Sequence, residues 1–110
     1  MEIGYQSNKL RKQLTNPKEL AKAFGQLAKK VNQRHEELKS VDNLSVMRLL
    51  PAACCHELSC NRNGTLAVKV SGNYRLVFQV SNDPIPQNHD GGLDWEAVTA
   101  ITIIEIVDYH

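Results

Sequence analysis

The chain has 110 residues, of which 13 are Lys or Arg and 12 are Asp or Glu, so its formal net charge is +1. This length suits one domain, residues 1–110, with a single core. No apolar run approaches the roughly twenty residues of a membrane-spanning helix, and no signal-peptide pattern is present, so we expect a soluble cytoplasmic protein. Three cysteines, an odd number, argue against a disulfide framework and for a reducing compartment.

The positive charge is concentrated early in the chain. Residues 1–40 hold nine Lys and Arg against four acids, a net +5, and residues 41–110 hold four against eight, a net −4. Such asymmetry favours an anionic partner such as nucleic acid or an acidic peptide. Exposed lysines on a long helix are the commoner explanation of the same pattern.

The N-terminal part predicts a short strand followed by a short helix. Residues 2–5 are the candidate strand. Ser7 is then placed to cap a helix in which Leu10 and Leu14 share one face.

A second, longer helix is predicted from Asn16 to about Ser40. Asn16 suits the N-cap and Pro17 suits the first helical position. Glu19 stands three residues after Asn16, as the acid of a capping box does. One face of this helix is apolar and is expected to lie on the sheet: Leu20, Phe24, Leu27, Val31 and Leu38. The opposite face is basic and is expected to be solvated: Lys18, Lys22, Lys29, Lys30 and Arg34.

A third, short helix is predicted after Asp42, its candidate cap, and before Pro51, which ends it. Residues 51–64 then predict a loop with a cluster of reactive side chains: Cys54, Cys55, His56 and Cys60. Adjacent cysteines are poor ligands for one tetrahedral zinc ion, and the chain has no Cys-x-x-Cys pair. We therefore predict no metal site.

The alternating run TLAVKVSGNYRLVFQV, residues 65–80, predicts a β-hairpin. A two-residue loop would set Val70 opposite Arg75 and mix core with solvent, whereas a three-residue loop at residues 71–73 separates the faces. On one face this register pairs Val70 with Tyr74, Val68 with Leu76, and Leu66 with Phe78. On the other face it pairs Ala67 with Val77 and Lys69 with Arg75. Two opposed cations repel each other, so an anion held between them is one explanation, and side chains that fan apart into water are the other.

The remaining segments complete an α+β pattern. Residues 81–93 predict a long loop, and residues 94–97 a helical turn in which Trp95 is expected to plug the core rather than stack on a base. The run from 98 to 107 is apolar on both faces and predicts a central strand. Helices come early and a mostly antiparallel sheet late, which indicates an α+β domain.

Four stretches together resemble the HigB-like branch of the RelE/ParE toxin superfamily, whose members belong to type II toxin–antitoxin modules. The stretches are CHELSCNRNG, GNYRLVF, NDPIPQNHDGGLDW and the final ITIIEIVDYH. The resemblance covers nearly the whole chain. It implies a small twisted, mostly antiparallel sheet with N-terminal helices packed on one face, a RelE-like fold.

The resemblance also implies a ribosome-dependent endoribonuclease that cuts mRNA without a metal or cofactor. Its implied partners are the ribosome, mRNA and a helix-turn-helix antitoxin protein, with operator DNA reached only through the antitoxin and no membrane involved. In such cleavage the 2′-hydroxyl attacks the phosphate. The reaction needs a base for the hydroxyl proton, a cation for the phosphate and an acid for the leaving oxygen.

Carried over by position, the implied catalytic residues are His56, Asp108, Tyr109 and His110. The residues expected to bind RNA phosphate are Arg62, Lys69 and Arg75. The α-carboxylate beside His110 favours its protonated ring, so we expect His110 to act as the acid and His56 as the base.

The chain departs from the family at one position that matters for the chemistry. Relatives commonly read H-E-L-K-G where this chain has His56-Glu57-Leu58-Ser59-Cys60, so a neutral serine replaces a lysine. The alternative interpretation is therefore a catalytically weak or silent family member. Such a protein acts by binding, as the partner of an antitoxin or as a ParE-like inhibitor of gyrase.

Overall fold

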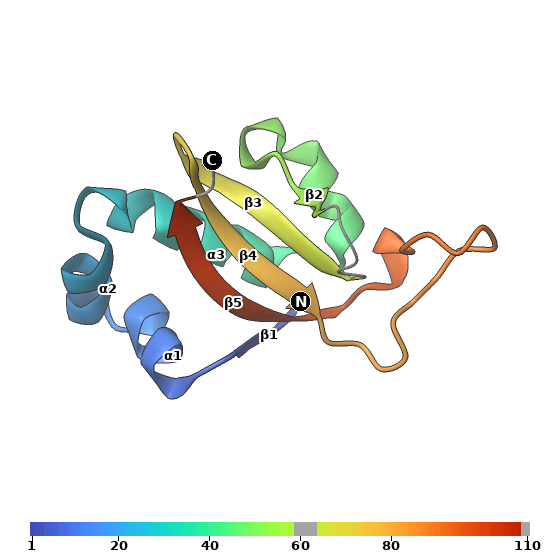
Figure 1. Ribbon diagram of the computed structural model, residues 1–110, viewed down its shortest axis with the longest axis horizontal. Helices are drawn as coiled ribbons and strands as arrows, with labels where there is room; N and C mark the ends of the chain where they lie inside the picture. The colour runs from blue at the N-terminus through green and yellow to red at the C-terminus, as the bar shows by residue number, and fades with distance from the viewer. Residues whose placement is uncertain (59–63, 109–110) are drawn as a thin grey trace.

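The chain folds around a five-stranded sheet that carries helices on one face (Figure 1). The computed structural model describes residues 1–58 and 64–108. The strands are β1 (Glu2–Tyr5), β2 (His56–Glu57), β3 (Thr65–Ser71), β4 (Tyr74–Val80) and β5 (Ala100–Asp108). The α-helices are α1 (Asn8–Thr15), α2 (Pro17–Phe24) and α3 (Ala28–Ser40). Four short 3₁₀ helices complete the described part: η1 (Gly25–Leu27), η2 (Leu44–Leu49), η3 (Pro51–Ala53) and η4 (Trp95–Ala97).

The sheet has the strand order β1-β5-β4-β3-β2. Strand β1 runs parallel to β5, and the other neighbours are antiparallel. Strand β5 lies between β1 and β4, so its two apolar faces fit the predicted central position. The predicted α+β class with a mostly antiparallel sheet is confirmed. Within residues 1–58 and 64–108, no helix is long and apolar enough to cross a membrane.

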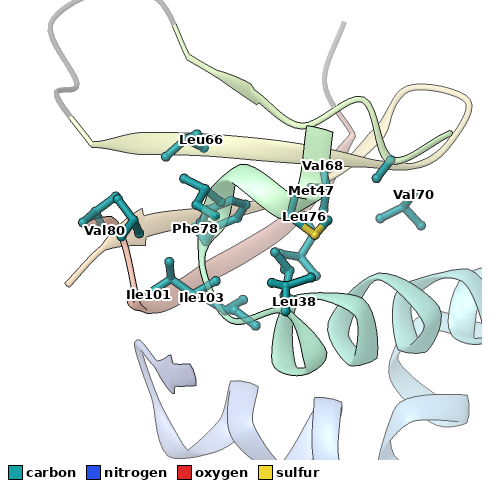
Figure 2. Close-up of a cluster of buried hydrophobic side chains, with 14 of the residues drawn as sticks. Leu38, Met47, Leu66, Val68, Val70, Leu76, Phe78, Val80, Ile101 and Ile103 are labelled. Atoms are coloured by element: carbon teal, nitrogen blue, oxygen red, sulfur yellow. The ribbon is translucent and has the colours of Figure 1, made fainter. Parts of the chain in front are cut away.

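The main core lies between the sheet and the helical layer. Figure 2 shows Leu38 of α3 and Met47 of η2 beside apolar side chains from β3, β4 and β5. The sheet contributes these fully or almost fully buried residues: Leu66, Val68, Val70, Leu76, Phe78, Val80, Ile101 and Ile103. Burying one such side chain stabilises the fold by about 1.5–3 kcal/mol, so this layer dominates the stability of the domain.

Both predicted N-caps at the start of the helical region are confirmed. The amide of Leu10 donates to Oγ of Ser7 at 3.1 Å. Oδ1 of Asn16 accepts from the amides of Lys18 and Glu19 at 2.9 and 3.3 Å. These bonds satisfy amides that lack partners within the first turn of each helix, and so they set where α1 and α2 begin.

The predicted continuous helix to Ser40 is wrong, because the chain breaks at Gly25. This residue has φ 52° and ψ −120°, a backbone conformation that residues with a Cβ atom rarely adopt. None of the residues of α2 is fully buried, although Leu20 and Phe24 pack against the edge of the core. The part in α3 is the one that is fully buried in the core, through Val31 and Leu38.

Arg34, predicted to be solvated, is instead only 3% exposed. Its Nε donates to the carbonyl of Lys69 at 2.7 Å, and its Nη2 donates to the carbonyl of Ala52 at 3.1 Å. Its Nη1 forms an ion pair of 2.9 Å with Glu37. One guanidinium therefore joins α3 to both β3 and η3. Arg34 is thus not part of the solvated basic face that the sequence predicted.

The hairpin has the predicted register over most of its length, and its turn is tighter than predicted. The confirmed pairs are Leu66 with Phe78, Ala67 with Val77, Val68 with Leu76, and Lys69 with Arg75. Strand β3 continues to Ser71, which pairs with Tyr74, so the loop consists of Gly72 and Asn73. The pairing shifts between Lys69 and Ser71, which makes Val70 an extra residue and leaves it without its predicted partner. A bulge of this kind has the same effect on register as a third loop residue.

Two details of the segment before the hairpin also differ from expectation. The third helix is the 3₁₀ helix η2, and its cap is Asn43 rather than Asp42, since Oδ1 of Asn43 accepts from the amide of Ser45 at 3.0 Å. His56 and Glu57 form the edge strand β2 rather than part of a loop.

Candidate functional site

His56 lies on the face of the sheet opposite the helical layer. It pairs with Ala67 of β3, and residues paired across antiparallel strands share a face. Lys69 is two residues further along β3 and therefore lies on the same face, as does Arg75 opposite it on β4. The structure thus brings together three of the predicted site residues, which we call the His56 face: His56, Lys69 and Arg75.

The spacing on this face suits one phosphodiester group. His56 and Lys69 are diagonal neighbours across β2 and β3, a relation that separates Cα atoms by about 7–8 Å. Both Lys69 and His56 are exposed. Since a long cationic side chain can close that gap, the imidazole and the ammonium group can both contact one anion at the surface. Ala67, which lies between them on β3, is itself fully buried.

In residues 1–58 and 64–108, neither Lys69 nor Arg75 forms an ion pair with a carboxylate. Nη1 of Arg75 donates to the carbonyls of Gly72 and Tyr74, at 2.8 and 3.0 Å, which holds the side chain against the turn. The predicted opposition of two cations is confirmed.

The ring of His56 is oriented by the backbone of Cys54. Nδ1 of His56 lies 2.8 Å from the carbonyl oxygen of Cys54. A carbonyl oxygen can only accept, so this bond requires the ring proton on Nδ1 and leaves Nε2 of the neutral imidazole without a proton. Nε2 is then the basic nitrogen of an exposed ring.

The carbonyl of Cys54 is presented by a strained residue. Cys54 has φ 45° and ψ 50°, and among the described residues it is the only non-glycine with positive φ. Left-handed backbone at a side-chain-bearing residue costs free energy and is concentrated at functional sites. Nothing in the sequence signals it, since cysteine is not a residue favoured in this conformation.

The neighbouring Cys55 has a different environment and a different chemistry. Its side chain packs against the core. Burial raises the pKa of its thiol to about 12, against a smaller lowering by Arg48. At neutral pH the thiol is therefore protonated and is a poor nucleophile, so Cys55 supplies no thiolate to the site.

A bulge in β5 adds an acidic residue to the His56 face that the sequence interpretation missed. Val77 pairs with Glu105 and Phe78 pairs with Ile103, so Ile104 is an extra residue. Without this residue, alternation from Ile103 would point Glu105 into the core. The bulge instead places Glu105 on the exposed side of the sheet, in the same row as His56.

The same bulge affects Asp108. It pairs with Tyr74, while Arg75 pairs with Val107. Successive residues of a strand point to opposite faces, so Asp108 lies on the face of Tyr74 and not on that of Arg75 and His56. The structure therefore does not bring Asp108 onto the His56 face, and its catalytic role stays a prediction. Arg62, Tyr109 and His110 lie outside the described residues, as do Ser59 and Cys60.

Trp95 has the structural role that was predicted for it. It is 6% exposed, and its Nε1 donates to Oε2 of Glu57 at 3.4 Å. The guanidinium carbon of Arg48 lies 4.0 Å from the centre of the ring. One ring face is thereby covered by a cation, so the indole offers no open platform for a base.

No protein-family model matches this chain, and no curated protein matches it in sequence.

Proposed function

We propose that this protein is the toxin of a type II toxin–antitoxin module and that it cleaves mRNA on the ribosome without a metal. The observation that carries the proposal is the bond between Nδ1 of His56 and the carbonyl of the strained Cys54. It leaves a basic nitrogen exposed on a face that also holds two cations. The resemblance of the four sequence stretches to HigB-like toxins supports the same activity.

The proposed reaction begins when Nε2 of His56 takes the proton of a ribose 2′-hydroxyl. The oxygen then attacks the adjoining phosphorus, the bond to the 5′-oxygen breaks, and the products are a 2′,3′-cyclic phosphate and a 5′-hydroxyl end. Lys69 and Arg75 stabilise the charge that develops on the phosphate oxygens. His110 protonates the leaving oxygen in this scheme.

The test compares His56→Ala with a matched histidine that lies far from the site in sequence. His89 is exposed on the long loop before β5 and serves as the control in His89→Ala. Purified proteins are added to translating ribosomes, and mRNA ends are mapped. Loss of a general base lowers the rate by about 10²–10⁴-fold, so His56→Ala should be nearly inactive and His89→Ala normal. Equal cleavage by the wild type and His56→Ala would exclude His56 as the base.

A second candidate is a catalytically silent family member that acts only by binding its antitoxin or, like ParE toxins, gyrase. The observation that favours it is the position of Asp108 on the face of Tyr74, because one implied catalytic group is then missing beside His56. Ser59 in place of the family lysine points the same way. Growth arrest without mRNA cleavage, unchanged in His56→Ala, supports this candidate over the first.

A further inference from the structure

The strongest charged surface of the molecule lies outside the His56 face. Residues 8–30, here called the helical lobe, comprise α1, α2, η1 and the start of α3. They carry seven Lys and Arg and one acid, a net +6, and the rest of the chain carries six against eleven, a net −5. The seven cations are Lys9, Arg11, Lys12, Lys18, Lys22, Lys29 and Lys30, and all are exposed.

None of these seven cations has an acidic partner in the described part of the chain. The ion pairs there are Arg34 with Glu37 and Lys39 with Glu36, both beyond the helical lobe. The lobe packs on the core through Leu10 and Leu14 and presents its cations to solvent. Figure 1 shows α1 and α2 at one end of the molecule, away from β2. The charge is thus gathered at one end of a particle that measures 44 × 26 × 25 Å.

The positions of several lysines work against the helices that carry them. Helices α1 and α3 have no acidic residue in their first turns. Lys9 lies in the first turn of α1, and Lys29 and Lys30 lie in the first turn of α3. The N-terminal end of a helix carries partial positive charge, so lysine there is unfavourable for the helix. Helix stability therefore gives no reason for these lysines, whereas a bound polyanion relieves their repulsion.

We propose that the helical lobe binds the sugar–phosphate backbone of double-helical RNA, at a surface separate from the His56 face. Lysine ammonium groups act as point charges toward phosphate and read no base sequence. The large hydrophobic residues that are exposed in the described chain, Leu49 and Tyr74, lie elsewhere, so the lobe offers no apolar anchor for a lipid surface. The choice of RNA as the polyanion rests on the proposed function.

The test removes charge from the lobe without touching the core. In the variant Lys18→Gln/Lys22→Gln/Lys29→Gln/Lys30→Gln, every changed side chain is exposed, so the melting temperature should stay near that of the wild type. Binding to a short blunt-ended RNA duplex of mixed sequence is followed by fluorescence anisotropy between about 50 and 200 mM salt. We expect at least tenfold weaker binding. The plot of log K against log salt should flatten by about 0.9 for each phosphate that the variant no longer neutralises. The control Lys39→Gln, which changes a lysine already paired with Glu36, should bind as the wild type does.

Several outcomes overturn the inference. Equal binding by the wild type and the fourfold variant removes the lobe as the RNA surface. If the wild type binds phosphatidylserine vesicles or a polyglutamate peptide but not the RNA duplex, and the fourfold variant loses that binding, the lobe binds a different anionic partner. Cleavage of mRNA by the wild type and duplex binding by the fourfold variant are measured separately, so failure of this inference can be distinguished from failure of the proposed function. Suppose that the wild type binds the RNA duplex but does not cleave mRNA, and that the fourfold variant does not bind the duplex. The lobe inference then stands and the proposed function fails.

Discussion

Replacing Arg34 with Met tests whether one buried guanidinium holds the helical layer to the sheet. Methionine keeps much of the apolar stem and removes every donor. The carbonyls of Lys69 and Ala52 then lose their bonds from Arg34, which are 2.7 and 3.1 Å long. Both bonds are partly buried, so losing them costs about 1–3 kcal/mol each, or about 2–6 kcal/mol for the two.

The lost ion pair changes this range only moderately. The side chain of Glu37 is 21% exposed, so its carboxylate regains part of its hydration when Arg34 is absent. Removing one partner of a buried ion pair costs about 3–5 kcal/mol in general. We therefore expect the free energy of unfolding to fall by about 3 kcal/mol. For 110 residues the corresponding fall in melting temperature is about 12 °C, since each kcal/mol shifts it by about 4 °C.

Urea denaturation followed by circular dichroism measures this loss. Lys39→Met is the matched control, because Lys39 forms a 3.5 Å ion pair on the exposed surface of the same helix. Exposed pairs contribute about 0–1 kcal/mol, so this variant should differ little from the wild type. Arg34→Lys keeps the charge but not the planar fork, and its stability should lie between the two. A loss below about 1 kcal/mol in Arg34→Met would refute the reasoning.

Three further predictions concern single residues. Burial lowers the pKa of His35 below its usual 6.5, with a further lowering by Lys39, so the unfolded chain binds the proton first. The free energy of unfolding should therefore fall as pH drops below about 6.5 towards the folded pKa, as measured by urea denaturation at a series of pH values. The same fall in His35→Gln would contradict this assignment. Gly25→Ala should destabilise the protein by about 1–3 kcal/mol because Gly25 has positive φ, and not through a clash, since no atom lies within 4 Å of the added methyl. An unchanged midpoint in urea denaturation would show that the break tolerates a side chain. Arg75→Ala should leave the free energy of unfolding within about 0.5 kcal/mol and weaken RNA binding, whereas unfolding without a separate binding loss would make Arg75 structural.

Local features of this protein were determined by nearby residues and could be predicted from them. The caps at Ser7 and Asn16 depend on a side chain and amides two or three positions away. The hairpin register from Leu66 to Lys69 depends on alternation within one short segment. Such short-range patterns carry their own physical cause, so the strands other than β2, the starts of α1 and α2, and the α+β class followed from the sequence.

The candidate site was only partly accessible in this way. Alternation placed Lys69 opposite Arg75, and the family resemblance pointed to His56. The backbone conformation of Cys54 left no signal in the sequence, because its strain is maintained by the surrounding packing. The burial of Arg34 was hidden for a related reason, since its partners Lys69 and Ala52 are distant in the chain.

The tertiary structure decided which side chains share a face of the sheet near the end of the chain. The sequence from Ala100 to Asp108 is regular, and strict alternation would send Glu105 into the core. The extra residue at Ile104 reverses the alternation, so Glu105 reaches the His56 face and Asp108 leaves it. Side chains alternate with a period of two, and a single inserted residue therefore reverses every position after it. Whether a strand contains that residue depends on its pairing with a neighbour, and β4 supplies that pairing only in the folded chain.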